Sequence, residues 1–332
     1  MEEYLTRRAI LRMPEKLFNI DYDLHPSYRG LSPSMAKRIK TLIVWLFQFV
    51  ISFLAVSVSQ LLFGHRRWKF VDRDEFSEGG VLAERNKALQ EKLSRLMKTE
   101  IAQLEIAIAN EDIELRDFET CIRHYSRKRN KELLRRIEED VKSTLSVKTA
   151  LSSYFRKVED VRLVAMNLHI NQESDRFVFQ HGEEDRPDEK MNFFHCDTNL
   201  FTVKAMIYLS EVRVVENGAF EYIVASHKVH SPLKLVLRRA LKKIRAINRD
   251  EESKLRLLCL PKWAREKNEF SDYASESELG LMISSAKQSF FRSSNLIVFN
   301  PLGLHRGGRV SKGKRIALQL VFATNDLSWR IF

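Results

Sequence analysis

The chain has 332 residues, 44% of them hydrophobic, and its 11 Gly and 7 Pro are too few for a collagen-like or disordered protein. Its three cysteines lie at unrelated spacings without a CxxC pair, which excludes a disulfide framework and indicates a reducing compartment. The net charge of +12 is uneven, since residues 228–270 carry thirteen Lys and Arg against five Asp and Glu. No nucleic-acid motif accompanies this basic segment, so a nucleic-acid-binding protein is not expected.

An N-terminal segment, residues 1–40, precedes a run of 23 residues without a charge, residues 41–63. As a helix this run is roughly 34 Å long, enough to cross a bilayer core of about 30 Å. Basic residues flank it on both sides in equal number, so the charge rule does not fix its orientation. We predict a single transmembrane helix at 41–63, and the alternatives are a buried helix or an interfacial hairpin. The run starts too far from Met1, and lacks the cleavage site, for a signal peptide.

Residues 78–158 have a helical pattern. A stripe of apolar residues at three- and four-residue spacing, from Leu89 to Ile108, continues at Leu133, and charges of both signs fill the remaining positions. The segment is either a stalk that oligomerises as a coiled coil or a helical layer packed on the following domain. The basic run 123–131 is expected to be a solvated turn between helices.

Short strands are expected after about residue 160. Apolar runs of strand length occur at 206–209, 220–223, 296–299 and 316–322, and Asn217-Gly218 is typical of a two-residue hairpin turn. The absence of a Gly-rich loop between strand and helix argues against nucleotide-binding α/β folds. The fold class is therefore α+β, with a β-sandwich or jelly roll over residues 159–332.

Four residues of this β region have the chemistry of an iron site. His195 and Asp197 lie two residues apart, so on a strand both side chains point to the same face. His305 follows later, and two imidazoles with one carboxylate form the facial ligand set of non-haem Fe(II) oxygenases. Arg315 begins another strand and offers a planar fork for a carboxylate.

These residues, in this order and strand context, resemble the phytanoyl-CoA dioxygenase family over residues 192–228 and 296–322. The resemblance implies a double-stranded β-helix, a jelly-roll form, with His195, Asp197 and His305 as Fe(II) ligands. It also implies that Arg315 binds the far carboxylate of 2-oxoglutarate, which is decarboxylated to succinate with O2 as the substrate is hydroxylated. The sequence departs from the family at Gly307, where members often carry a hydroxyl residue.

Other histidines and arginines near these motifs are expected to be structural. His227 and His230 follow a strand end and either lie in a loop or contact substrate or metal. His169 has no second potential metal ligand at a spacing that would indicate a shared metal site. Arg306 and Arg309, beside His305, are expected at a solvated rim, with contact to an anionic substrate as the alternative.

The basic segment belongs to an expected lid insertion, residues 228–290. Its sequence LKLVLRRALKKIRAI predicts an amphipathic helix, which suits an anionic membrane surface, a phosphorylated or acyl-CoA-like substrate, or an ordinary lid with a solvated face. The favoured hypothesis is a membrane-anchored Fe(II)/2-oxoglutarate hydroxylase of a lipid or lipid-linked substrate, with its catalytic domain in the cytoplasm. The alternative is a membrane-tethered scaffold with an inactive jelly roll.

Overall fold

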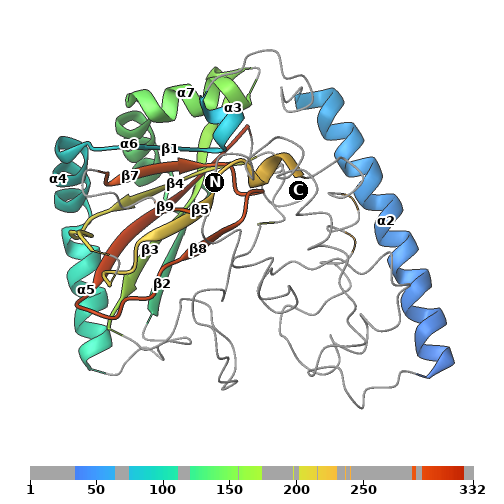
Figure 1. Ribbon diagram of the computed structural model, residues 1–332, viewed down its shortest axis with the longest axis horizontal. Coiled ribbons are helices and arrows are strands. Elements are labelled where there is room, and N and C mark those ends of the chain that lie inside the picture. Colours follow the sequence, from blue (N-terminus) through green and yellow to red (C-terminus); the bar gives the residue numbers. More distant parts are fainter. Residues whose placement is uncertain are drawn as a thin grey trace, which may run out of the picture.

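The protein combines helices with two antiparallel sheets. The computed structural model describes residues 34–63, 75–110, 120–155, 157–173, 197, 202–214, 216–229, 236, 240, 286–288 and 294–324. In Figure 1 the two sheets lie together with most of the helices, while the long helix α2 (Met35–Phe63) runs along the other side of the molecule.

The larger sheet has six strands in the order β1-β7-β4-β9-β3-β2, with every neighbouring pair antiparallel. The bounds in chain order are β1 Val81–Glu84, β2 Thr120–Ser126, β3 Arg162–Asn171, β4 Val203–Tyr208, β7 Leu296–Phe299 and β9 Arg315–Ala323. The smaller sheet has the order β6-β5-β8, with β5 at Phe220–Ile223, β6 at Ala286–Gln288 and β8 at His305–Gly307.

Helices cover one face of the larger sheet (Figure 1). They are α3 Glu75–Gly79, α4 Lys87–Leu96, α5 Lys98–Ala109, α6 Lys131–Lys142 and α7 Leu145–Tyr154. Alternate residues of β9, among them Leu318 and Leu320, join one apolar cluster with helix residues such as Leu93 and Ile137. This burial of apolar area provides the main stabilisation of the layer.

The other face of the larger sheet meets the smaller sheet. Phe220 and Tyr222 of β5 form a second cluster with Phe299 of β7 and Ala317 of β9, so the sheets pack against each other there. Elsewhere this face is polar although it is buried, and it carries His169, Asn171, Lys204 and Arg315. A buried polar face needs partners for its hydrogen-bonding groups, so it is the natural place to look for a site.

The segment 78–158 was expected to be helical. Its described residues include helices α4 to α7 but also the strands β1 and β2. Its helical part packs on the larger sheet, as in the second of the two alternatives. The expected basic turn at 123–131 is wrong in its first part, because Arg123 to Ser126 lie in β2 and pair with β3.

The expected hairpin at Asn217-Gly218 is also wrong. β4 pairs with β7 and β9, whereas β5 pairs with β6 and β8, so the intervening chain passes from one sheet to the other. A turn does form there, with Gly218 at φ +77° and the Asn217 side chain accepting a hydrogen bond from Arg213 N at 3.1 Å.

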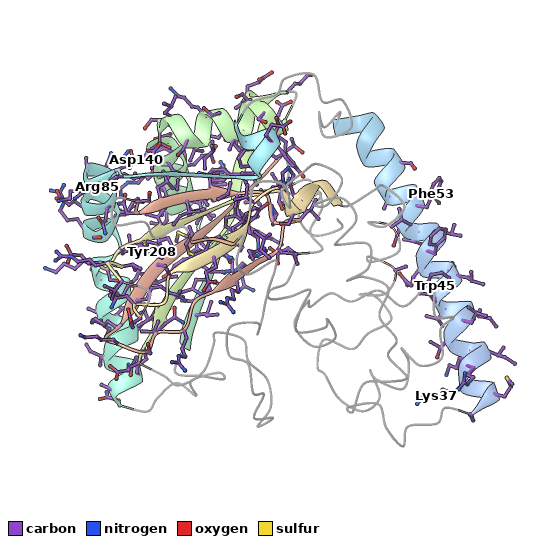
Figure 2. All side chains as sticks on the ribbon, viewed as in Figure 1. Lys37, Trp45, Phe53, Arg85, Asp140 and Tyr208 are labelled. Carbon is purple, nitrogen blue, oxygen red and sulfur yellow. The ribbon has the colours of Figure 1, made fainter. Side chains whose placement is uncertain are left out.

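Helix α2 is long and apolar enough to cross a membrane, with a span at Met35–Ala55 of which 17% is buried. Large apolar side chains such as Phe47 and Phe53 are more than half exposed, and Figure 2 shows Phe53 and Trp45 along the helix and Lys37 near its start. A core helix of a soluble protein would be mostly buried. The exposure of α2 therefore fits a membrane span or a signal sequence better.

Candidate active site between the two sheets

The structure brings two of the predicted site residues together. Asp197 precedes β4, and its backbone N–H donates to the carbonyl of Pro301 at 2.8 Å, which ties it to the chain leading into β8. His305 is the first residue of β8, and its Nε2 lies 3.5 Å from Asp197 Oδ2. His195 lies outside the described residues.

The hydrogen bonding of the His305 ring shows which of its two nitrogens faces Asp197 and which faces the backbone. Its Nδ1 lies 2.8 Å from the carbonyl oxygen of Gly303, which only accepts hydrogen bonds, so Nδ1 carries the proton. In the neutral imidazole, Nε2 then presents a lone pair towards the Asp197 carboxylate. Two acceptors that face each other are stabilised by a cation between them, and metal bonds of about 2.0–2.2 Å fit this spacing.

Aromatic rings enclose His305. The ring centroids of Phe299 and Phe220 lie 5.0 and 5.6 Å from that of the imidazole, and the His305 side chain is 4% exposed. These rings fix the orientation of the imidazole and keep water from its edges.

Lys204 is a site residue that sequence reasoning missed. Its Nζ donates to Asp197 Oδ2 at 2.6 Å, and its side chain is 8% exposed. The ammonium thus neutralises the same carboxylate oxygen that faces His305. The signal was available in principle, since a lysine inside an otherwise apolar strand, VKAMIY, is unusual.

Arg315 is a buried cation without an anionic partner among the described residues. Its Nε and Nη2 donate to Asn171 Oδ1 at 3.1 and 3.0 Å, and its Nη1 donates to the carbonyl oxygens of Gly218 and Gly308. Burial lowers the pKa of its guanidinium. A buried guanidinium that meets only neutral acceptors forms a site for an anion.

A chain of hydrogen bonds connects the polar side chains of β2, β3 and β9. His124 Nδ1 lies 2.8 Å from Asn167 Oδ1, and Asn167 Nδ2 donates to Gln319 Oε1 at 3.1 Å. Gln319 in turn hydrogen bonds the ring of His169. Burial, together with Arg315 and Lys204, lowers the pKa of His169 to about 3, so its imidazole is neutral near pH 7.

Arg306 does not lie at a solvated rim, which corrects the expectation for this residue. It is 5% exposed, and its Nη2 lies 2.8 Å from Glu221 Oε2 in a buried ion pair between β8 and β5. Its position in the strand, opposite Glu221 in register, explains the pairing.

His227 is half-buried, and its Nε2 lies 3.2 Å from the carbonyl oxygen of Ser77 in α3. His230 and nearly all of the segment 228–290 lie outside the described residues.

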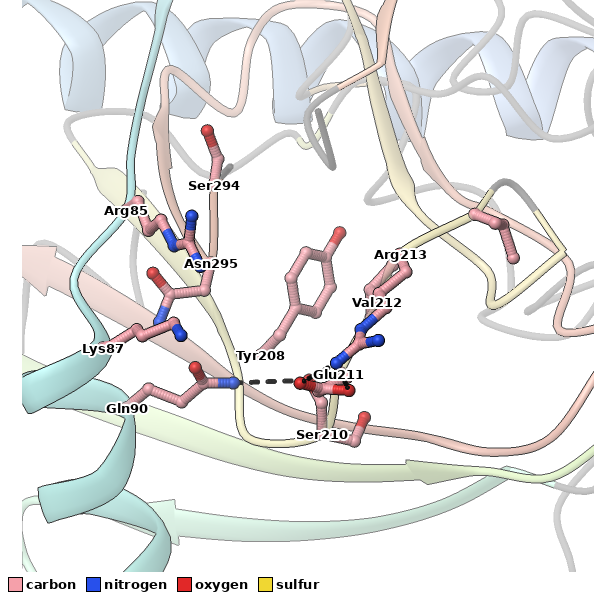
Figure 3. Close-up of a pocket in the computed structure, with 11 residues that line it drawn as sticks. Arg85, Lys87, Gln90, Tyr208, Ser210, Glu211, Val212, Arg213, Ser294 and Asn295 are labelled. Atoms are coloured by element: carbon pink, nitrogen blue, oxygen red, sulfur yellow. Dashed lines mark hydrogen bonds and ion pairs between the residues drawn. The ribbon is translucent and has the colours of Figure 1, made fainter. Parts of the chain in front are cut away.

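A separate pocket of about 440 Å³ lies at the end of β4, away from Lys204. Figure 3 shows Arg85, Lys87 and Gln90 on one side of it and Glu211 and Arg213 on another, with Tyr208 between them. Arg213 is paired with Glu211 at 2.6 Å. None of the predicted iron-site residues lines this pocket.

Within the described part of the chain, no group of three His, Cys, Asp or Glu side chains converges on a metal position.

No known protein family matches the chain, and no curated protein matches it either. Among solved structures it is similar to HygX from Streptomyces hygroscopicus with nickel and 2-oxoglutarate bound, at 18% identity over 75% of this chain and 84% of that one, with a TM-score of 0.38. AviO1 from Streptomyces viridochromogenes Tue57 has 11% identity over 75% and 91% of the two chains, and a TM-score of 0.40. The epimerase SnoN in complex with Fe3+, alpha ketoglutarate and nogalamycin RO has 11% identity over 75% of this chain and 80% of that one, with a TM-score of 0.40. These similarities are too low to carry an argument about the site, which depends on the geometry above.

Proposed function

We propose that the protein is an Fe(II)/2-oxoglutarate-dependent oxygenase that hydroxylates its substrate. The observation that carries the proposal is the pair formed by His305 and Asp197, whose metal-binding atoms face each other at 3.5 Å. Arg315 supports it as well, since it is buried on the larger sheet and has no anionic partner among the described residues. His195 would complete the ligand set, and the two facing antiparallel sheets fit a double-stranded β-helix.

The chain's own residues have separate tasks in this proposal. Asp197 and His305 would hold the metal, and the Gly303 carbonyl keeps the proton on Nδ1 so that Nε2 stays available. Arg315 would neutralise the far carboxylate of 2-oxoglutarate, and the rings of Phe220 and Phe299 exclude water. Iron, when bound, supplies the oxidation that converts 2-oxoglutarate and O2 into succinate and CO2 while a C–H bond is hydroxylated.

The test is an anaerobic titration of the full-length protein in detergent micelles with Fe(II) and 2-oxoglutarate, following the visible charge-transfer band of the iron–keto-acid chelate. We expect a saturable band in the wild type and none in a His305→Ala variant that keeps its circular dichroism spectrum. A folded wild type without a band would refute the oxygenase and favour a membrane-tethered scaffold.

We further propose that α2 anchors the protein in a membrane and that the substrate is a lipid or lipid-linked molecule. Its exposed apolar side chains support the first part, as do Lys37, Arg38 and Lys40 near its start. The net charge of +8 in residues 228–270 supports an anionic membrane surface or substrate. Extraction of isolated membranes with alkaline carbonate tests the anchor, because a spanning helix stays in the pellet. Mass spectrometry of the mature chain distinguishes it from a cleaved signal sequence.

A further inference from the structure

The pocket at the end of β4 gathers basic side chains. Its volume of about 440 Å³ is in the range of small-molecule sites. Arg85, just before α4, and Lys87, the first residue of α4, line one side of it, and neither forms an ion pair with a described residue (Figure 3). On the other side Arg213 is paired with Glu211. Three basic groups thus face one carboxylate, which leaves an excess of two positive charges in the pocket.

Hydrogen bonds between separate segments of the chain hold the basic side of the pocket in place. Asn86, which lies between the two unpaired basic residues, donates its backbone N–H to Asn295 Oδ1 at 2.7 Å, and its carbonyl accepts from Asn295 Nδ2 at 3.1 Å. Gln90 Nε2 donates to the carbonyl of Ser210 at 3.5 Å, which links α4 to the segment after β4. The backbone that carries both cations is therefore fixed before a ligand binds, which lowers the entropic cost of binding.

The two sides of the pocket are close enough to interact electrostatically. The hydrogen bond from Arg213 lowers the pKa of Glu211, and the charge of Lys87 on the opposite side lowers it further. Lys87 therefore acts on the space between the two sides. Because Arg213 already binds the Glu211 carboxylate, Arg85 and Lys87 are the groups that remain to attract an anion.

The arrangement of the charges indicates the class of anion. Arg85 and Lys87 are two residues apart on the same side of the pocket, so they suit one compact group with a double charge better than two separate carboxylates. A phosphate monoester carries about two negative charges at neutral pH. Guanidinium and ammonium groups both bind phosphate oxygens. The volume leaves room for a small organic group, which would contact the apolar side chains of Val212 and Val214.

The place of the pocket in the molecule indicates the source of the phosphate. Figure 2 shows Arg85 and Tyr208 on the opposite side of the molecule from Trp45 and Phe53 of α2. The pocket thus lies far from the helix that would enter a membrane. A soluble ligand therefore fits this position better than a lipid headgroup.

We propose that this pocket binds a soluble phosphate monoester of a small organic molecule. Arg85 and Lys87 bind the phosphate, and the organic group lies against Val212 and Val214. The site is separate from the proposed iron site, and the proposal does not depend on the oxygenase.

The test is a calorimetric titration of the full-length, metal-free protein in detergent micelles. The probes are glycerol 3-phosphate, glycerol, which lacks the charge, and short-chain phosphatidate, which carries the same phosphate on a lipid. Arg85→Gln and Lys87→Gln each remove one cation from the pocket, and Glu211→Gln removes its carboxylate. Arg95→Gln is the matched control, because this exposed arginine of α4 does not line the pocket.

We expect the wild type to bind glycerol 3-phosphate saturably and glycerol not at all. Binding of glycerol 3-phosphate should be about tenfold weaker in Arg85→Gln and in Lys87→Gln, the usual effect of losing a hydrogen bond to a charged group. It should be a few-fold tighter in Glu211→Gln and unchanged in Arg95→Gln.

Two results would overturn the proposal. One is a wild type with an intact circular dichroism spectrum that does not bind glycerol 3-phosphate, and the other is equal weakening in Arg95→Gln, which would indicate attraction to the surface charge in general. Phosphatidate that binds more than tenfold tighter than glycerol 3-phosphate, and loses this affinity in Arg85→Gln, would replace the soluble ligand with a lipid headgroup. None of these results bears on the oxygenase, since no iron or keto acid is present.

Discussion

Lowering the pH from 8 to 5 should destabilise the wild-type protein by about 2 kcal/mol more than it destabilises a His169→Leu variant. The pKa of His169 is lowered to about 3 in the folded protein, from 6.5, by burial and by the nearby charges of Arg315 and Lys204. Between these two values the unfolded chain binds a proton at this ring and the folded chain does not. The stability contribution is therefore complete above about pH 6.5 and is lost as the pH falls.

The magnitude follows from the two pKa values. At pH 5 the unfolded-state ring is about 1.5 pH units below its pKa and the folded-state ring stays neutral, so the difference is about 2 kcal/mol at 1.36 kcal/mol per unit. Leucine has no titratable group and a similar volume, so the variant lacks this slope. Titrating groups elsewhere are common to both proteins and cancel in the difference.

The assay is urea unfolding of both full-length proteins in the same micelles, followed by circular dichroism at pH 8, 6.5 and 5. The free energy of unfolding of the wild type should decline more steeply below pH 6.5. If both proteins lose the same free energy, the ring of His169 is accessible to protons in the folded state. The polar face between the sheets is then open to water rather than buried.

Three further substitutions test other parts of the structure. Glu138→Gln removes the charge that Arg127 faces between α6 and β3, and urea unfolding should show a loss of about 2–3 kcal/mol. Gly303→Ala places a Cβ against the Tyr222 hydroxyl and shifts the carbonyl that orients the imidazole of His305, the proposed metal ligand. Calorimetry with Mn(II) should therefore show about tenfold weaker binding with an unchanged far-UV spectrum. Lys204→Met removes the ammonium that pairs with the carboxylate of Asp197, the other proposed metal ligand, and Mn(II) binding should become about tenfold tighter. Weaker binding would mean that the ammonium orients the carboxylate instead.

The sequence suggests candidate residues where their identity alone indicates their chemistry. His305, Asp197 and Arg315 could be put forward because imidazole, carboxylate and guanidinium follow one another beside apolar runs. The structure places the first two 3.5 Å apart, and their role in metal binding stays a prediction. Lys204 and His169 were missed because neither stands in a motif. Their importance depends on the register of β3, β9 and β4, which brings residues from distant parts of the chain onto one face.

The same non-local pairing explains the errors in the fold. β1 has only the four residues Val81–Glu84, so its sequence cannot be distinguished from the start of the helical segment. Its partner β7 lies near the other end of the sequence. β2 was read as part of a basic turn because its charged residues hide the alternation of a strand, and only its pairing with β3 defines it.

Two parts of the molecule reverse the usual distribution of polar and apolar groups. In each, the exposed or buried side chains indicate which kind of molecule should contact them. On the face between the sheets, the described residues give the buried Arg315 only neutral hydrogen-bond partners, which is unfavourable until an anion binds there. Helix α2 exposes residues such as Phe47 to solvent, which is unfavourable until lipid surrounds it. A carboxylate ligand should therefore raise the unfolding temperature of the sheets, whereas lipid or detergent should determine the solubility of the whole chain. Separate responses to the two additions would show that co-substrate binding and membrane attachment are independent properties of this protein.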